Sequence, residues 1–452
     1  MKELLFSIFI YWCYIFASDA QQTDATKGIK AIVEQKCIKC HFDGGAAPFA
    51  FNSFEDLIQR KGTVKYVVEN RLMPIWKPDP KFSHFADENY LSDEEIKMIK
   101  DWLDNDSKNQ NSKIKFSKEV IEKTILKSKP DYVVTTKSEL KLQPIGEDLF
   151  GIVKIPFEFN EAFDVGAIVF ENDQKKLLHH VSIFILEDDF IANRNENSTP
   201  SYFFQPPIKY LDSLPKDFNV YRYLNIVPEG KYEYWDRMIY KTHSQPGKTP
   251  SAFPVGCGFR MPKKGVILLD MIHYLQTPKV EFDNIRIKFY KQQKAKRAAI
   301  SASIGIGNPN STGSHITLLP NQQKWLESST VLPADMSLFE ITPHMHQVGR
   351  KYIAVAITPQ NDTIPLIKID NWDMGWQETY RFEKLLKLPK GTQIVISGYY
   401  DNSAANPYNP NKPPNIVRQS MNKQDEMLLL MLTFFEYKEG DEKQKIQYSL
   451  KF

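Results

Sequence analysis

The spacing of apolar and polar positions divides the chain into a helical front part and a β-rich remainder. In residues 27–106, apolar side chains recur every three or four positions, which is typical of helices that bury one face. From about residue 131 onward, short apolar runs are separated by turn residues at short intervals. The pattern therefore predicts a small all-α domain followed by all-β sandwiches, without the strand–helix alternation of an α/β fold.

The helical part contains four expected segments. Ser92 and Glu95 form a capping box, which predicts that the last helix begins here. Trp102 lies on the apolar face of that helix. The expected helices are Lys27–Lys36, Phe54–Arg60, Thr63–Arg71 and Glu94–Asn105.

Strands are expected throughout the second part, and two polar stretches suggest its boundaries. Residues 107–130 are rich in Lys, Asn and Ser and are interpreted as a linker. The basic stretch Lys291–Ala299 predicts a boundary between two sandwiches, 131–290 and 291–452. The clearest expected strands are Gly151–Pro156, Ala167–Phe170, Val181–Leu186, Gly265–Tyr274, Ile285–Phe289, Lys351–Ile357 and Thr392–Ser397.

The composition adds few constraints. Of 452 residues, 42% are hydrophobic and 25% are charged, so each domain can bury a core. The 58 basic and 55 acidic residues nearly balance, which gives no reason to expect a nucleic-acid partner.

The N-terminus has the pattern of an export signal. Lys2 precedes the apolar run Leu4–Phe16, and small residues follow at Ser18–Ala20, so residues 1–20 are expected to be cleaved before Gln21. The alternative is an uncleaved anchor, although the run is short for a bilayer. No later stretch is long and apolar enough to span a membrane, so we expect none after cleavage.

Cleavage would remove Cys13, leaving Cys37, Cys40 and Cys257. One possible disulfide cannot hold together an exported protein of this size, so the first two cysteines are expected to have another role. Cys257 is expected to be a small buried apolar residue.

Residues Cys37–His41 read C-x-x-C-H, the attachment motif of c-type haem. Two thiols add to the two vinyl groups of one porphyrin, and the next residue then lies beneath the ring, where its imidazole can bind iron. A thioredoxin-like pair or half a zinc site would also contain C-x-x-C. The adjacent His41 and the lack of a second C-x-x-C argue against both.

The sixth iron ligand is expected to be a thioether or a second imidazole. Met73 precedes a proline about thirty residues after His41 and is the preferred candidate, with His84 as its rival. A core methionine would also explain Met73.

Five other histidines form local groups in the β-rich part. His344 and His346 are two apart, so in an extended chain they share one face and offer two nitrogens to a metal. His179 and His180 are neighbours and can reach one metal only at a strand end or an irregularity. His273 lies in another expected strand, and three imidazoles would suit copper, zinc or iron.

Four segments of the β-rich part, in their order along the chain, resemble the copper type II, ascorbate-dependent monooxygenases. This family includes peptidylglycine α-hydroxylating and dopamine β-monooxygenases. The resemblance covers about residues 131–452 and is closer still to bacterial proteins that fuse such a module to a cytochrome c, which share the loop Tyr400–Pro407. The segments are Leu178–Val181, Met271–Tyr274, Thr342–Arg350 and Asp425–Met427.

The resemblance implies two copper sites on two jelly-roll-like sandwiches that face each other across a cleft. His179, His180 and His273 would hold the electron-transfer copper. His344, His346 and Met427 would hold the copper at which oxygen binds and a substrate C–H bond is hydroxylated. A thioether ligand favours Cu(I) over zinc.

The sequence departs from the peptide-amidating branch at two positions. Thr342 occupies the place of an arginine that recognises the substrate carboxylate, and Met431 occupies the place of an aromatic residue. A peptide substrate is therefore not expected. His243 and His315 are left without a metal role and are interpreted as surface or structural residues.

The expectation is a periplasmic or secreted Gram-negative oxidoreductase with one haem c and two coppers. Its partners would be O2, a small organic substrate and an external donor, either an ascorbate-like reductant or another cytochrome. The alternative is an exported electron-transfer or copper-binding protein without turnover. A zinc hydrolase is disfavoured because no general base is evident beside the histidines.

Overall fold

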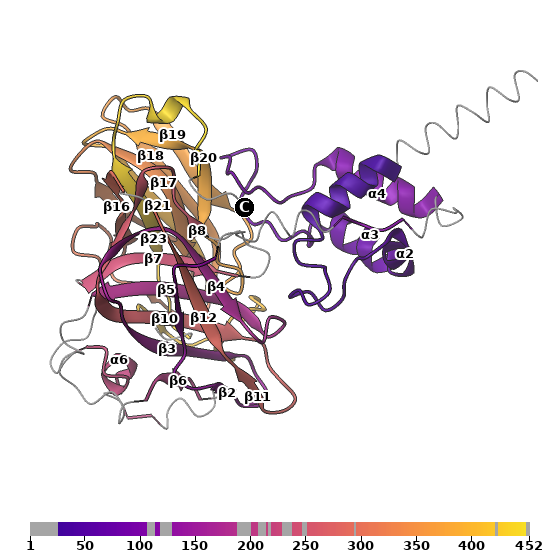
Figure 1. The fold of residues 1–452 in the computed structure, drawn as a ribbon, viewed down its shortest axis with the longest axis horizontal. Helices are drawn as coiled ribbons and strands as arrows, with labels where there is room; N and C mark the ends of the chain where they lie inside the picture. The colour runs from indigo at the N-terminus through magenta and orange to yellow at the C-terminus, as the bar shows by residue number, and fades with distance from the viewer. Residues whose placement is uncertain are drawn as a thin grey trace, which may run out of the picture. The chain divides into compact units, whose positions relative to one another are not determined.

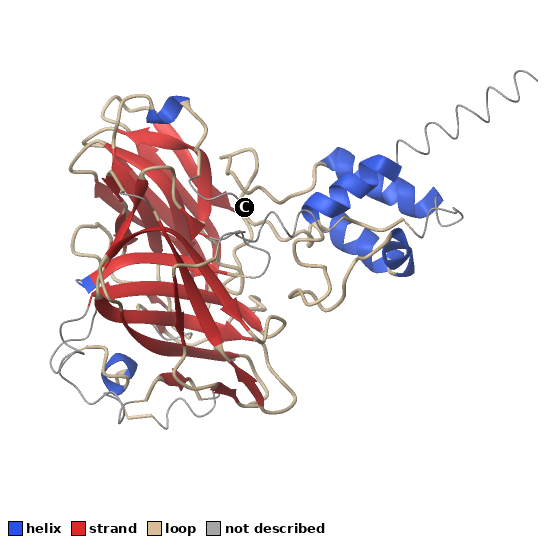
Figure 2. Cartoon of the chain, viewed as in Figure 1, coloured by secondary structure: helices blue, strands red, loops and turns tan. Residues whose placement is uncertain are grey.

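The computed structural model describes residues 26–105, 114–117, 129–187, 200–206, 214–215, 218–227, 237–245, 251–292, 295–420 and 424–448. The expected export signal and most of the expected linker lie outside these residues. Among the described residues, no helix has both the length and the apolar character needed to cross a bilayer. The chain forms two compact units, one helical and one composed of β-strands (Figures 1 and 2).

The helical unit contains the helices that the apolar spacing predicts. Residues 26–36 are helical, followed by α2 (Phe54–Gln59), α3 (Lys61–Glu69) and α4 (Asp93–Asn105). The capping box before α4 is confirmed, because the Ser92 amide donates to the Glu95 carboxylate at 2.8 Å and the Glu95 amide donates to the Ser92 hydroxyl at 3.1 Å.

The helices of this unit enclose one small apolar core. Trp102 of α4 is buried and packs against Phe54 of α2, with ring centroids 4.9 Å apart. The same core includes Ile38 of the C-x-x-C-H motif, so the motif is anchored by packing.

One segment departs from the expected continuous domain at 27–106. Residues Lys77–Asp87 group with the β unit, although the residues on both sides of the segment group with the helical unit. Within the β unit, Phe85 is buried against Tyr380 and Phe382, and the Ala86 amide donates to the Arg381 carbonyl at 2.7 Å. We call Lys77–Asp87 the strap.

The first half of the β unit is a sandwich of two main sheets. One has the order β1-β12-β4-β9-β13, with β8 paired to β4, and the other has the order β6-β3-β10-β5-β7. Leu269 and Ile285 come from opposite sheets and belong to the same core cluster. The strands are β1 (Tyr132–Thr135), β2 (Leu140–Leu142), β3 (Leu149–Glu158), β4 (Phe163–Asn172), β5 (Leu178–Glu187), β6 (Tyr202–Phe204), β7 (Met238–Ser244), β8 (Ser251–Ala252), β9 (Cys257–Met261), β10 (Lys264–Tyr274), β11 (Glu281–Asp283), β12 (Ile285–Lys291) and β13 (Arg297–Ala298), and α6 (Val220–Tyr223) is a short helix.

The second half repeats this arrangement with two four-stranded sheets, β14-β23-β17-β20 and β16-β21-β18-β19. Alternate residues of β21 are buried, the period expected for a strand with one face on a core. The strands are β14 (Ile300–Gly305), β15 (Thr317–Leu318), β16 (Gln323–Val331), β17 (Met336–His344), β18 (Gly349–Ile357), β19 (Thr363–Ile369), β20 (Tyr380–Leu388), β21 (Gln393–Asp401), β22 (Val417–Arg418) and β23 (Leu429–Glu436), followed by the 3-10 turn η7 (Asp441–Lys443).

Candidate metal centre

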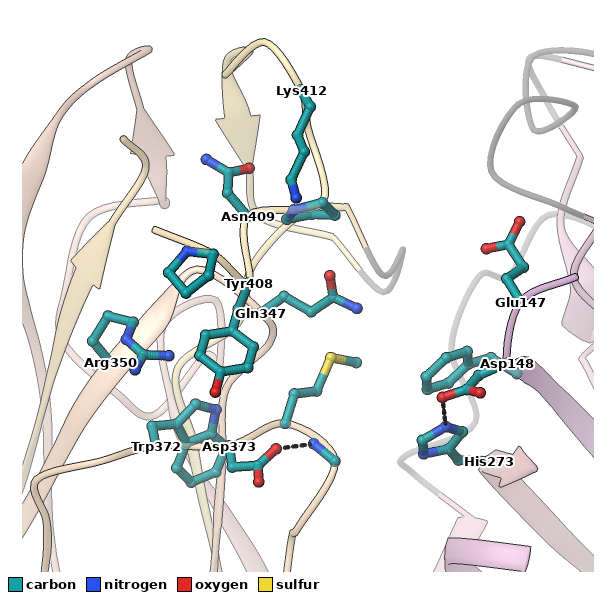
Figure 3. Close-up of a pocket in the computed structure, with 15 residues that line it drawn as sticks. Glu147, Asp148, His273, Gln347, Arg350, Trp372, Asp373, Tyr408, Asn409 and Lys412 are labelled. Atoms are coloured by element: carbon teal, nitrogen blue, oxygen red, sulfur yellow. Dashed lines mark hydrogen bonds and ion pairs between the residues drawn. The ribbon is translucent and has the colours of Figure 1, made fainter. Parts of the chain in front are cut away.

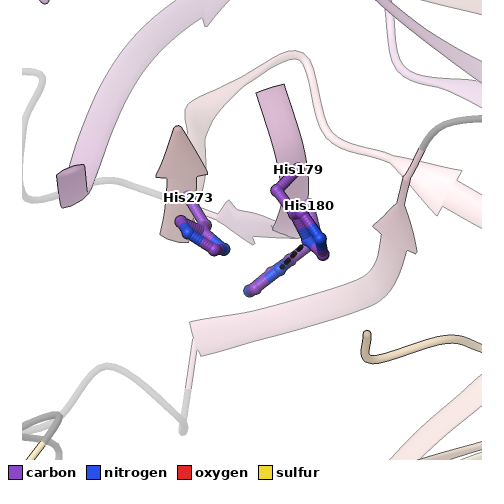
Figure 4. Close-up of side chains that lie close together, drawn as sticks. All are labelled: His179, His180 and His273. Carbon is purple, nitrogen blue, oxygen red and sulfur yellow. Dashed lines mark hydrogen bonds between the residues drawn. The ribbon is translucent and has the colours of Figure 1, made fainter. Parts of the chain in front are cut away.

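Three imidazoles converge in the first sandwich. His179, His180 and His273 each offer one nitrogen, and these nitrogens lie within 4.8 Å of one another (Figure 4). His179 and His180 come from the start of β5, and His273 comes from the end of the neighbouring strand β10. The structure thus brings together the three residues expected at the first metal site.

A β-bulge in β10 explains how the third ring reaches the other two. The register between β10 and β5 shifts between Asp270 and His273, and Met271 within the shift has a φ of 51°. An extra residue re-aims the side chains that follow it, so His273 comes to lie opposite His180. His179 is the second residue of β5, at the strand end where neighbouring side chains can converge.

The nitrogens of this cluster could hold a metal ion. The Nε2 of His273 donates to the Asp148 carboxylate at 2.9 Å, while its Nδ1 is buried and lacks a hydrogen-bond partner in the described structure. In a histidine that binds a metal, one imidazole nitrogen usually bonds a carboxylate and the other binds the metal. The Nδ1 of His180 donates to the Gly375 carbonyl at 3.2 Å, and its buried Nε2 has no hydrogen-bond partner among the described residues.

Burial keeps the imidazoles of His179 and His180 neutral. It lowers the pKa of His179 to about 4, with a further contribution from nearby His273. Burial also lowers the pKa of His180 well below its ordinary value, and the nearby His273 and His179 add to the effect. A neutral imidazole is the form that binds a metal.

A second imidazole pair lies in the second sandwich. His344 is the last residue of β17, and His346 follows two residues later, with the ring centroids 5.1 Å apart. The Nδ1 of His344 donates to the side-chain oxygen of Gln377, and the Nδ1 of His346 donates to the Asp425 carbonyl at 3.0 Å. The Nε2 of His346 is buried and finds no hydrogen-bond partner within the described residues.

Met427 lies beside this pair along the backbone. β17 pairs with β23 so that His344 is opposite Leu429, two residues after Met427. Burial lowers the pKa of His344 to about 3, with a contribution from His346, so His344 is neutral.

Glu426 joins the two segments that carry His346 and Met427. Its fully buried carboxylate accepts the amides of His346 at 2.8 Å and of Met427 at 3.1 Å. It also accepts the amides of Val348 at 2.8 Å and Gly349 at 3.0 Å. Burial raises the pKa of Glu426 to about 8, although these four hydrogen bonds act in the opposite direction.

A cleft of about 510 Å³ lies between the two sandwiches (Figure 3). His273 and Asp148 form part of one wall. Gln347, which follows His346, lies on the opposite wall with Arg350 and Tyr408. The Arg350 guanidinium stacks over the Tyr408 ring at 4.7 Å. A small organic molecule could therefore reach the surroundings of both histidine clusters from one cavity.

The C-x-x-C-H motif forms a tight turn in the helical unit. The His41 amide donates to the Cys37 carbonyl at 3.1 Å, and Cys37 and Cys40 are half-buried and not joined by a disulfide. The His41 ring lies 4.8 Å from both Phe49 and Phe51, and its Nδ1 donates to the Phe49 carbonyl at 3.0 Å. This leaves Nε2 as the nitrogen that could bind an iron.

The two candidates for the opposite iron ligand lie in different units. Met73 follows α3 in the helical unit and is 40% exposed. His84 is exposed and lies on the strap, within the β unit. The choice of Met73 stays a prediction.

The residues expected to have no metal role are accounted for by their surroundings. His243 is buried with its Nε2 2.8 Å from the Ser182 hydroxyl, so it is structural and not at the surface. His315 is exposed and bonds Gln419. Cys257 is buried in the apolar core as expected. The Thr342 hydroxyl bonds the Thr379 hydroxyl at 2.8 Å.

Several partners of the histidines could not be identified from sequence. Asp148 precedes β3, and Gln377 follows β19, and neither is close in sequence to the histidine that it contacts. The cluster of Trp, Asp and Gly at 372–376 was the only available signal of a compact turn.

Comparisons with known proteins do not identify a relative. No protein-family model and no curated protein matches the chain. Among solved structures, VP2 of infectious bursal disease virus in a subviral particle matches at 7% identity and a TM-score of 0.16, over 73% of this chain and 81% of its own. The protein PNGF-II matches at 11% identity and a TM-score of 0.19, over 68% and 60%. These TM-scores are too low to support any inference about fold or function.

Proposed function

We propose that this protein is an exported copper-dependent monooxygenase that hydroxylates a C–H bond of a small organic substrate with O2. The observation that carries the proposal is the convergence of His179, His180 and His273, with ligand nitrogens within 4.8 Å. The His344/His346 pair adds a second candidate site across the interface of the two sandwiches.

The residues present fit two metal ions. The buried Nε2 of His180 and Nδ1 of His273 have no hydrogen-bond partner among the described residues, which is costly unless a ligand satisfies them. The donor sets differ, since one is all imidazole and the other would include the Met427 thioether, which favours Cu(I). Copper bound at these positions would supply one-electron redox chemistry and oxygen activation.

The protein's own groups would orient the ligands and the substrate. Asp148 fixes the tautomer of His273, and Gln377 fixes that of His344. Glu426 holds the backbone of the second site in place. The cleft would bind the substrate, and its Arg350–Tyr408 wall offers a cation and an aromatic face.

Electrons would enter through a c-type haem bound to Cys37, Cys40 and His41, with Met73 as the second axial ligand. The helical unit would then be a small cytochrome c domain fused to two jelly-roll-like copper domains. An ascorbate-like reductant or another cytochrome would reduce the haem. The protein would act in the periplasm or be secreted.

A zinc hydrolase remains disfavoured. The acidic residue nearest the second pair, Glu426, already accepts four backbone amides and is fully buried, so it cannot act as a general base on a bound water.

The proposal is tested by measuring oxygen consumption by the protein after it has been produced in cells that attach haem c. With ascorbate and a mixture of small amines and aromatic compounds, we expect ¹⁸O from ¹⁸O2 to appear in a hydroxylated product. The His346→Ala variant should lose this product while its haem still reduces, and His315→Ala should match the wild type because His315 is exposed and bonds only Gln419 among the described contacts. Reversible haem reduction without any substrate-dependent oxygen uptake would instead favour an electron-transfer or copper-binding protein.

A further inference from the structure

A single turn of the second sandwich contacts both histidine clusters. Residues Trp372–Gln377 lie between β19 and β20, and four of the six proposed copper ligands have a contact with this turn. We call Trp372–Gln377 the bridging turn. The function proposed above uses only Gln377 of this turn, as the hydrogen-bond partner of His344.

On one side the bridging turn reaches the three-histidine cluster. The Gly375 carbonyl accepts a hydrogen bond from the Nδ1 of His180 at 3.2 Å, which leaves the buried Nε2 of His180 for a metal. A side chain on Gly375 would begin 3.5 Å from the Cε1 of His179. The Trp376 ring is perpendicular to that of His179, with centroids 6.0 Å apart.

On the other side it reaches the second pair. The Gln377 side-chain oxygen accepts the Nδ1 hydrogen of His344. The Trp372 indole donates to the His346 carbonyl at 3.1 Å. Only one residue, Trp376, separates the contact with His180 from the contact with His344.

Internal hydrogen bonds make the turn a compact body. The side-chain nitrogen of Gln377 donates to the Met374 carbonyl at 2.9 Å. The Gly375 amide donates to the Asp373 carboxylate at 2.9 Å. The Trp376 amide donates to the Asp373 backbone carbonyl at 3.0 Å. A displacement at one end of such a turn is therefore passed to the other end.

We propose that the bridging turn couples the two metal sites, so that filling either site raises the affinity of the other. The inference rests on the proposed function. An ion that fixes the imidazoles of one site also orders the turn, and the second ion then binds ligands that are already held in place. Thermodynamic linkage requires the two sites to affect each other by the same factor.

Gln377 is the residue that isolates the effect. It bonds His344 and Met374 and makes no hydrogen bond to the three-histidine cluster among the described residues. Any effect of Gln377 on that cluster must therefore pass through the turn. Asp148 provides the opposite case, because it contacts His273 and Gln276 and lies outside the turn.

The experiment measures copper binding to the full-length haem protein by competition with a chelator, with electron paramagnetic resonance assigning each Cu(II) to its site. The proteins compared are wild type, Gln377→Leu, His346→Ala and the double variant. We expect Gln377→Leu to weaken the three-histidine site about fivefold or more. His346→Ala removes the second site. The double variant should therefore bind copper at the three-histidine site no more weakly than His346→Ala alone.

Two controls and one alternative variant make the outcome decisive. Asp148→Asn should weaken the three-histidine site but leave the affinity of the second site unchanged at copper concentrations that still fill the first, because Asp148 lies outside the turn. Gln393→Leu should change neither site, because Gln393 bonds Ser329 on the neighbouring strand β16 and neither residue belongs to the bridging turn. If Gln377→Leu does not fold, Gly375→Ala tests the coupling from the other end, and its methyl group beside His179 should change the resonance of the second site.

Two results would overturn the inference. If Gln377→Leu leaves the affinity and the resonance of the three-histidine site unchanged while wild type binds two coppers, the coupling is wrong and the proposed function stands. If wild type binds fewer than two coppers, the proposed function and the coupling both fail.

Discussion

At the residue scale, the predicted ligands share one property. Five buried or half-buried imidazoles each have one nitrogen fixed by a carbonyl or carboxylate oxygen: His41, His180, His273, His344 and His346. This fixes the ring and its tautomer and leaves the other nitrogen for a metal. The sequence predicted which histidines group together, but it could not reveal Asp148 or Gln377, because both are brought to the site only by folding.

Glu426 gives a residue-scale prediction about stability. Glu426→Ala would leave four buried backbone amides without an acceptor, and each such loss costs about 1–3 kcal/mol. We expect the free energy of unfolding, measured in urea without added copper, to fall by about 3 kcal/mol or more. Glu436→Ala is the matched control, because Glu436 is exposed at the end of β23 and should change stability by less than about 0.5 kcal/mol. Equal midpoints for the two variants would contradict the prediction.

At the element scale, the site depends on strand ends and one irregularity. β5 begins at Leu178 and β17 ends at His344, so each histidine group lies where regular pairing stops. Period-two patterns predicted the strands around Val181–Leu186 and Lys351–Ile357. The bulge at Met271 could not be predicted, because no glycine or proline marks it. β17 itself was missed, because its polar residues Glu340 and Thr342 are buried and break the apolar pattern.

The strap gives an element-scale prediction. Phe85 is 3% exposed and packs between Tyr380 and Phe382, so Phe85→Ala should remove about 3–5 kcal/mol from the unfolding free energy of the β unit. Limited proteolysis should then cut within 77–87 more rapidly than in wild type. Phe282→Ala is the matched control, because Phe282 is 48% exposed. Unchanged cleavage in Phe85→Ala would mean that the strap is not anchored by this ring.

Acid should release the same strap through Asp79. The Lys81 amide and the Lys368 ammonium, which lies 3.0 Å from the carboxylate, hold the pKa of Asp79 below its ordinary value of about 3.9. A carboxyl group with a lowered pKa in the folded protein contributes stability above its ordinary pKa and loses it as the pH falls through the lowered value. Cleavage of the strap by an acid protease should therefore increase below about pH 4, and the Asp79→Asn variant should show a smaller increase.

At the scale of the whole molecule, the sequence divided the chain into a helical part and a β-rich part, and the structure has both. The β-sandwich architecture follows from the sheets and their shared cores. The assignment of the strap to the β unit was not predictable, because Phe82 and Phe85 are consistent with either core by composition. The haem, the coppers and the reaction are proposals that the side-chain arrangement supports.

The metal and haem content of the purified protein, produced with haem maturation and loaded with copper, tests the central claim most directly. The account predicts two coppers and one covalent haem per chain, with one copper lost in His273→Ala and the other lost in His346→Ala. A protein that binds haem but retains no copper after removal of excess metal would contradict the oxygenase account.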